Sequence, residues 1–199
     1  MTLNIAWVKG KKTYIAADRK IIAKGNILNG TKVYPNGKLL ITSCGSVGDL
    51  EYIINQELPQ PDIKDNESWQ KYIVNELSPA IRKLYFEKKY VLSKENEKDK
   101  SEALRSYITV GYGGFFACIW SDGNPYFIDL PWYCDGCGLD IANGAIEAYL
   151  KLKPNIKIDV ILPDIFDIVE QHNTDCGGGY NIWVSELGKE PFFLKGRSR

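Results

Sequence analysis

The sequence predicts an α+β fold in which antiparallel sheets lie in layers with helices outside them. Strand patterns come in groups separated by pairs of helical patterns, in the order strands, two helices, strands, two helices, strands. The turns between neighbouring strands have hairpin length, which favours antiparallel pairing. Because the 199 residues contain no long linker and no internal repeat, we expect a single domain over residues 1–199.

The first strands form two predicted hairpins. Residues 3–8 and 14–17 carry apolar side chains in strand patterns on either side of a glycine-lysine turn, so Thr2 is expected where the first strand begins. Residues 32–34 and 39–44 predict the second hairpin, which turns at a Pro-Asn-Gly sequence and ends in a loop of small residues.

Two helical patterns follow the second hairpin. Apolar residues at helical spacing begin after Asp49 and stop at Pro59. Residues 69–84 repeat apolar side chains every three to four positions, and Pro79 inside this run predicts a kink or a break in its hydrogen bonds. Residues 93–102 are almost all polar or charged, which predicts an exposed loop or a solvated helix end.

The second half of the chain repeats this order. Strand patterns recur at residues 106–110, 115–120 and 126–128, as an antiparallel meander, and at residues 180–184 and 192–194, as a closing pair. Asp140 is placed to cap a third helix, and Pro163 is placed to open a fourth. Residues 156–162 alternate, so a strand is also open for that segment.

Composition argues against several classes of partner. Lys and Arg number 25 and Asp and Glu number 25, so there is no basic field to attract nucleic acid. The chain has no apolar run near the ~18 residues of a membrane span, and residues 1–20 do not form a secretory signal. We therefore expect a cytoplasmic protein without nucleic-acid or membrane partners, whose five cysteines are free thiols.

Four segments carry the functional signal, and three weaker ones follow them in order. The four are Thr2, Ile15-Ala16-Ala17-Asp18-Arg19, Asn29-Gly30-Thr31-Lys32-Val33-Tyr34 and Cys44-Gly45-Ser46-Val47-Gly48-Asp49; the weaker ones are residues 110–114, 133–138 and 175–179. By their order and spacing, the chain resembles a proteasome β-subunit and the peptidase subunit of the bacterial two-component ATP-dependent protease, both N-terminal-nucleophile hydrolases. The resemblance implies a four-layer αββα sandwich, with two antiparallel sheets packed face to face and helices outside.

The same resemblance implies a threonine endopeptidase. After removal of Met1, the Thr2 hydroxyl would attack a peptide carbonyl and the free Thr2 amine, with an ordinary pKa of about 7.7 to 8.0, would act as its base. Lys32 would favour the neutral amine and stabilise the developing alkoxide, and Asp18 would orient Lys32. The Gly45 N–H would stabilise the oxyanion.

Further positions follow from the resemblance. Cys137 replaces the serine of a Gly-Ser-Gly loop that supports the terminal amine, Asp175 matches the family's aspartate, and Cys176-Gly177 stands where a second serine is expected. A thiol is a weaker hydrogen-bond donor than a hydroxyl, so we expect these departures to affect the rate more than the nucleophile. The first specificity pocket would be lined by Lys20, Ser43 and Val47.

The resemblance also implies partners. The substrate would be a peptide or an unfolded protein, hydrolysed inside homo-oligomeric rings. An ATP-dependent unfoldase would deliver substrates to these rings. The resemblance implies neither a cofactor nor a metal. With no extension or propeptide in front of Thr2, we expect a catalytic type of subunit that removal of Met1 alone activates.

Two other functions stay open at this stage. If Met1 is retained, the amine is blocked, and the chain would be a catalytically silent, proteasome-like assembly or scaffold protein. Alternatively, Cys134, Cys137, His172 and Cys176 would make a three-cysteine, one-histidine zinc site. The 34 residues between Cys137 and His172 exceed the spacing of short zinc fingers, and the only histidine ends a predicted helix.

Overall fold

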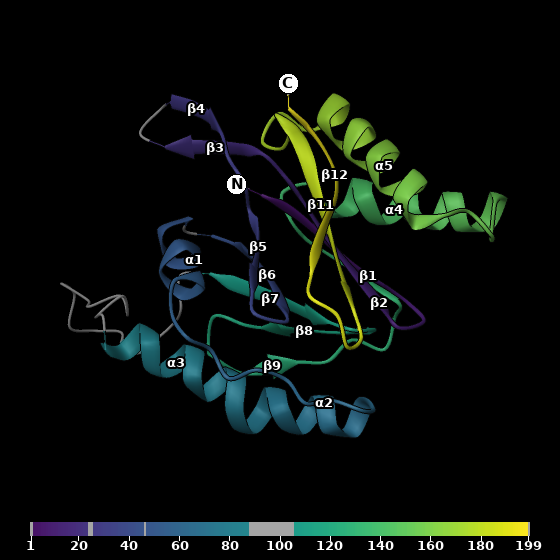
Figure 1. Cartoon of the computed structure of the whole chain (residues 1–199). Helices are drawn as coiled ribbons and strands as arrows, with labels where there is room; N and C mark the ends of the chain where they lie inside the picture. Colours follow the sequence, from purple (N-terminus) through teal and green to yellow (C-terminus); the bar gives the residue numbers. More distant parts are fainter. Residues whose placement is uncertain (1, 24–25, 46, 88–105, 199) are drawn as a thin grey trace.

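Two five-stranded antiparallel sheets form the centre of the computed structural model, which describes residues 2–23, 26–45, 47–87 and 106–198 (Figure 1). The first sheet has the order β10 (Trp132–Gly136), β1 (Leu3–Lys9), β2 (Lys12–Asp18), β11 (Gly179–Glu186) and β12 (Phe192–Ser198). The second has the order β5 (Val33–Asn36), β6 (Leu39–Cys44), β7 (Tyr107–Tyr112), β8 (Phe115–Ile119) and β9 (Pro125–Tyr126). A separate hairpin pairs β3 (Lys20–Ala23) with β4 (Asn26–Asn29).

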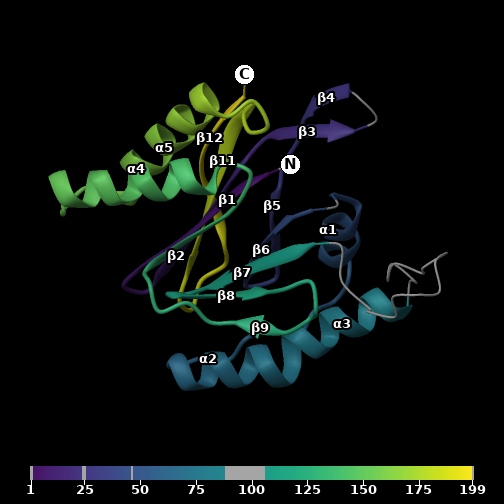
Figure 2. The ribbon, with the colours of Figure 1, turned by 180° about the vertical axis from the view of Figure 1, so that it is seen from behind.

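The helices cover the outer faces of the sheets, as Figures 1 and 2 show from opposite sides. The helices are α1 (Val47–Ile54), α2 (Asn66–Tyr72), a π-helical turn η1 (Ile73–Leu77), α3 (Ser78–Glu87), α4 (Leu139–Leu152) and α5 (Ile158–His172). Helices α4 and α5 pack on the first sheet, whereas α1 to α3 pack on the second. The predicted α+β fold with antiparallel sheets and outer helices is confirmed.

Alternation along β1 separates the packing layers. Leu3, Ile5 and Trp7 enter the hydrophobic cluster shared with α4 and α5. Ala6 points the other way and packs between the two sheets with residues such as Leu40. Successive strand residues face opposite sides of a sheet, so one apolar face meets helices and the other meets the second sheet. Thr2 therefore stands at the end of a strand that is buried on both faces.

Pro79 affects the second helical segment as its position predicts. The chain is α-helical up to Tyr72, widens into the π-helical turn η1, and continues as α3 from Ser78. The Ser78 N–H reaches back to the Ile73 carbonyl, five residues earlier. Proline donates no hydrogen bond and its ring crowds the preceding turn, so the wider turn ahead of it relieves both defects.

Two helix boundaries differ from the sequence-based expectation. Helix α5 begins at Ile158 and contains Pro163, so neither a helix opening at Pro163 nor a strand over 156–162 is correct. Ile161 and Ile165 are buried on the α5 face that packs on the first sheet, and this burial outweighs the local cost of proline. Helix α4 has Gly138 as its N-cap, and Asp140 lies within its first turn.

The sequence patterns did not predict strand β10 or the β3–β4 hairpin. Strand β10 is an edge of the first sheet and pairs with β1, and the β3–β4 hairpin stands apart from both sheets. Residues 93–102, predicted to be exposed, lie outside the described residues. Among the described helices, none is long and apolar enough to cross a membrane.

Candidate active site around Thr2

Pairing of β1 with β10 fixes the position of Thr2, which is only 5% exposed. The Thr2 carbonyl accepts a hydrogen bond of 2.9 Å from the Cys137 N–H, and Leu3 lies opposite Gly136 in the ladder. Gly136 has a φ of +97°, and a Cβ added there would lie 1.8 Å from the Thr2 carbonyl oxygen. Only glycine fits this close approach of two backbones.

The Asp18 carboxylate, at the end of β2, receives four hydrogen bonds. Its Oδ1 accepts from the Leu3 N–H at 2.9 Å and from Lys32 Nζ at 2.8 Å. Its Oδ2 accepts from the Lys20 N–H at 3.3 Å and the Gly177 N–H at 3.1 Å. The carboxylate thus joins the amino-terminal strand, the buried lysine and the loop before β11, and these contacts fix its orientation.

Lys32 is buried beside Asp18, directly before β5. Burial lowers the pKa of the Lys32 ammonium from its ordinary value, although the neighbouring Asp18 carboxylate opposes this shift. The backbone at Lys32 is also held, because Thr42 Oγ1 lies 2.7 Å from the Lys32 carbonyl oxygen and 2.9 Å from Asn4 Oδ1. The Lys32 side chain is therefore buried, and it is connected through Asp18 Oδ1 to the N–H of Leu3, the residue next to Thr2.

Three of the residues predicted to bind the oxyanion or the substrate lie around the end of β6, whereas the fourth, Lys20, begins β3. Gly45 follows β6, is exposed and has a φ of +135°, which favours glycine. Ser43 is buried on β6 and, by alternation, faces the same side as Leu39 and Ile41. Val47 is the first residue of α1, and its side chain is outside the described set.

A cavity of about 430 Å³ lies next to the Asp18 network. Its lining residues come from β3, β4, α5 and the loop before β11, and they are Lys20, Ile27, Asn29, Glu170, Asn173, Thr174, Cys176, Gly177 and Gly178. Lys20 Nζ donates to the Thr174 carbonyl across this cavity wall. Because Lys20 and Gly177 also donate to Asp18, the cavity and the Asp18 network share two residues.

The prediction of five free thiols is wrong, because two of the cysteines form a disulfide. Cys137 and Cys176 form a disulfide, with Cα atoms 6.5 Å apart, whereas Cys44, Cys118 and Cys134 are free and buried. The β10–α4 turn and the α5–β11 loop meet here, so two cysteines 39 residues apart become neighbours. In this state neither Cys137 nor Cys176 can donate the hydrogen bond of the serine it replaces.

The disulfide also argues against the zinc alternative. Two of its four ligands are engaged in the sulfur–sulfur bond, and a metal-bound cysteine must be a free thiolate. His172 is exposed at the last position of α5, as predicted for the end of a helix. Asp175 lies in the α5–β11 loop, where its N–H donates to Asn173 Oδ1 at 2.8 Å.

Asp135 was missed by the sequence analysis. It lies opposite Asn4 in the β1–β10 ladder, and its carboxyl group interacts with the Cys44 thiol. Burial raises the Asp135 pKa above its ordinary value, and the buried Oδ2 atom has no hydrogen-bond partner among the described residues. The Cys44 sulfur lies 3.8 Å from the Thr2 carbonyl oxygen. An acidic residue directly before the Gly-Cys-Gly turn was the available signal.

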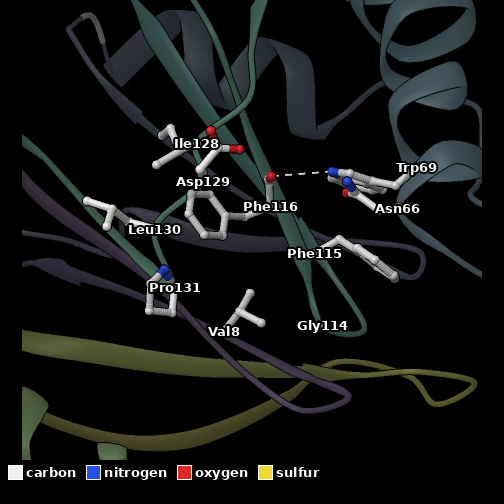
Figure 3. A pocket seen from close by; sticks show the side chains of 10 residues that line it. All are labelled: Val8, Asn66, Trp69, Gly114, Phe115, Phe116, Ile128, Asp129, Leu130 and Pro131. Carbon is white, nitrogen blue, oxygen red and sulfur yellow. Dashed lines mark hydrogen bonds between the residues drawn. The ribbon is translucent and has the colours of Figure 1, made fainter.

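A second cavity, of about 230 Å³, lies at the Val8 end of β1, away from Thr2 (Figure 3). Apolar side chains, among them Phe116 and Leu130, surround it, and Trp69 Nε1 donates to the Phe116 carbonyl at 3.3 Å. None of its lining residues belongs to the Thr2 and Asp18 cluster, so we assign the candidate active site to the opposite end of the strand.

Comparisons with known proteins identify the fold. No family model and no curated protein matches the sequence. The structure of Thiobacillus denitrificans BPH is similar with a TM-score of 0.70 at 16% identity, over 96% of this chain and 100% of that one. The structure titled "Thiobacillus denitrificans BPH in complex with Epoxomicin" is similar with a TM-score of 0.69, at 16% identity, over 95% of this chain and 100% of that one. The chain therefore shares the fold of these structures over nearly its whole length.

Proposed function

We propose that this chain is a threonine-type endopeptidase whose nucleophile and base are the hydroxyl and the amine of Thr2 after removal of Met1. One observation carries the proposal. The buried Lys32 ammonium contacts Asp18, and the same Asp18 oxygen accepts the N–H of Leu3, the residue next to Thr2. Asp18 thus connects the buried lysine to the residue next to the proposed nucleophile.

The reaction proceeds through an ester of Thr2. The neutral amine takes the hydroxyl proton while Oγ attacks the peptide carbonyl, and a tetrahedral oxyanion forms. The Lys32 charge stabilises the developing alkoxide, and the Gly45 N–H donates to the oxyanion. The Thr2 ammonium then protonates the leaving amine. Water, activated by the same amine, hydrolyses the ester and regenerates the free hydroxyl.

The similar structure with epoxomicin supports this assignment. Thiobacillus denitrificans BPH binds epoxomicin, a proteasome inhibitor, in that structure. Because this chain has the same fold, with a TM-score of 0.69, that complex supports a proteasome-like peptidase function for it. Substrate peptides would enter near Lys20, Ser43 and Val47.

Assembly is part of the proposal. Peptides or unfolded proteins would be cleaved within homo-oligomeric rings, with an ATP-dependent unfoldase unfolding protein substrates and delivering them to the rings. The exposed apolar side chains of the β3–β4 hairpin, Ile22, Ile27 and Leu28, are consistent with burial against another subunit. Native mass spectrometry of the full chain tests this point, and a monomer at micromolar concentration contradicts it.

The decisive experiment joins intact mass with probe labelling. We expect the purified protein to lack one methionine and to react with an epoxyketone or a β-lactone at Thr2. Thr2→Ala should abolish labelling and peptide cleavage while leaving the melting temperature unchanged, and Thr2→Ser, which keeps a hydroxyl, should retain measurable cleavage. A native protein that keeps Met1 and ignores both probes contradicts the peptidase assignment and favours the silent scaffold.

A further inference from the structure

The Cys137–Cys176 disulfide joins two loops that hold different parts of the candidate active site. On one side, the Cys137 N–H donates to the Thr2 carbonyl at 2.9 Å. On the other side, Gly177, the neighbour of Cys176, donates its N–H to Asp18 Oδ2 at 3.1 Å. One covalent bond therefore fixes the distance between the support of the nucleophile and the support of the carboxylate.

The Cys176 loop also sets the path of the chain after Asp18. The Gly177 carbonyl accepts hydrogen bonds from the Arg19 N–H at 3.0 Å and the Lys20 N–H at 2.8 Å. A shift of this loop therefore moves three backbone contacts around Asp18 together. A hydrogen bond from the Asn173 side chain to the Cys137 carbonyl also connects the two loops.

The bond is placed where a reductant can reach it. Cys176 has little solvent-exposed surface, but it is one of the residues that line the cavity of about 430 Å³. Cys137 is only half-buried. By contrast, the free thiols Cys44, Cys118 and Cys134 are all buried, and burial raises the pKa of Cys118 and Cys134 to about 12. These three remain protonated and unreactive near neutral pH.

We propose that the Cys137–Cys176 disulfide is a redox site that positions Thr2 and Asp18, and that a dithiol reductant converts the peptidase to a form of low activity. This inference rests on the proposed function. A thiolate of the reductant attacks one sulfur and breaks the sulfur–sulfur bond, and its second thiol resolves the mixed disulfide. The protein gains two electrons and two protons as two cysteine thiols, and the reductant becomes a disulfide.

Loss of the bond lowers activity for two reasons. The two loops regain independent motion, so the Cys137 and Gly177 N–H groups hold Thr2 and Asp18 less tightly, and displacement of reacting groups by about 1 Å costs on the order of 10²-fold in rate. The released thiols are weak hydrogen-bond donors and do not replace this restraint. The oxidised form is therefore the active one.

The test compares the full-length protein before and after treatment with dithiothreitol, with the disulfide followed by mass spectrometry under non-reducing conditions. We expect reduction to lower kcat for peptide cleavage by on the order of 10-fold or more, and reoxidation to restore it. Cys137→Ala/Cys176→Ala should match the reduced protein and ignore dithiothreitol. Cys118→Ala, which removes a buried free thiol, should keep both the activity and the redox response.

Hydrogen exchange separates this inference from the proposed function. Reduction should accelerate amide exchange at Cys137 and Gly177, whether or not the protein cleaves peptides. If exchange accelerates but the oxidised protein neither cleaves peptides nor labels with an epoxyketone, the peptidase assignment fails and the positioning role of the bond survives. If complete reduction leaves both exchange and kcat unchanged, the redox site is refuted.

Discussion

Lys32 Nζ lies 2.8 Å from Asp18 Oδ1, and both side chains are almost fully buried. Each charge is removed from water and depends on the other for compensation. Such pairs add little net stability as pairs, but loss of one partner leaves an uncompensated buried charge. The site is therefore most sensitive to single substitutions within this pair.

Lys32→Met should abolish peptide cleavage and lower the free energy of unfolding by about 3 to 5 kcal/mol, because Asp18 is then buried without its cation. Urea denaturation and a peptide cleavage assay measure the two effects. Lys71→Met is the control, since it removes an exposed ion pair with Glu67 and should cost about 0 to 1 kcal/mol. Equal losses in the two variants would contradict the buried-pair assignment.

The lowered pKa of Lys32 predicts a dependence of stability on pH. Between the folded-state pKa and the ordinary value of 10.5, the unfolded chain binds more protons than the folded one, so the free energy of unfolding contributed by Lys32 rises with pH. The difference between wild type and Lys32→Met should therefore increase from about pH 7 to about pH 10. Urea midpoints across this range measure it, and a flat difference argues against the shift.

Gly136→Ala should disrupt the start of β1, because the added Cβ would overlap the Thr2 carbonyl and would also lie 2.8 Å from the Cys44 sulfur. We expect a lower melting temperature and loss of probe labelling at Thr2. Gly144→Ala is the matched control. Gly144 lies within α4, and a Cβ added there would meet open space, so alanine should stabilise the helix by about 0.5 to 1 kcal/mol. Tolerance of alanine at position 136 would show that the close approach is not required.

Asp135→Asn should stabilise the protein increasingly as pH rises. The raised pKa means that the folded state binds more protons than the unfolded state above the ordinary value of 3.8, so stability from Asp135 is lost as pH rises through its folded-state pKa. Asparagine does not ionise. The difference in unfolding free energy between variant and wild type should thus be small near about pH 3 and larger at about pH 7. A difference that shrinks with pH would contradict the direction of the shift.

Much of the fold follows from local patterns, but not its non-local parts. The alternation of residues 3–8 is strong enough to identify β1. Pro79 predicted an irregularity in the second helical segment, and the structure shows it as the π-helical turn η1. Strand β10 is short and lacks alternation, and it becomes a strand by pairing with β1 about 130 residues away. Helix α5 keeps Pro163 because its buried face outweighs the helix-breaking effect of one residue.

The site divides in the same way. Asp18 and Lys32 were identified from the order of their segments, and the structure brings their side chains into contact. Ser43 and Lys20 lie on different elements and remain a predicted pocket. The Cys137–Cys176 disulfide could not be predicted from the sequence, because only the packing of α4 and α5 on the first sheet brings the two loops together. Nothing in cysteine spacing distinguishes this pair from the other pairs of the five cysteines.

The hydrogen bond from Gly177 to Asp18 spans 159 positions, and it has a consequence for synthesis on the ribosome. Asp18 is synthesised long before Gly177, which donates to its carboxylate. Until residue 177 has emerged, Asp18 lacks this donor, and the disulfide cannot form before Cys176 is present. If Thr2 is the nucleophile that we propose, a nascent chain shorter than 177 residues carries it without the complete set of hydrogen bonds around Asp18.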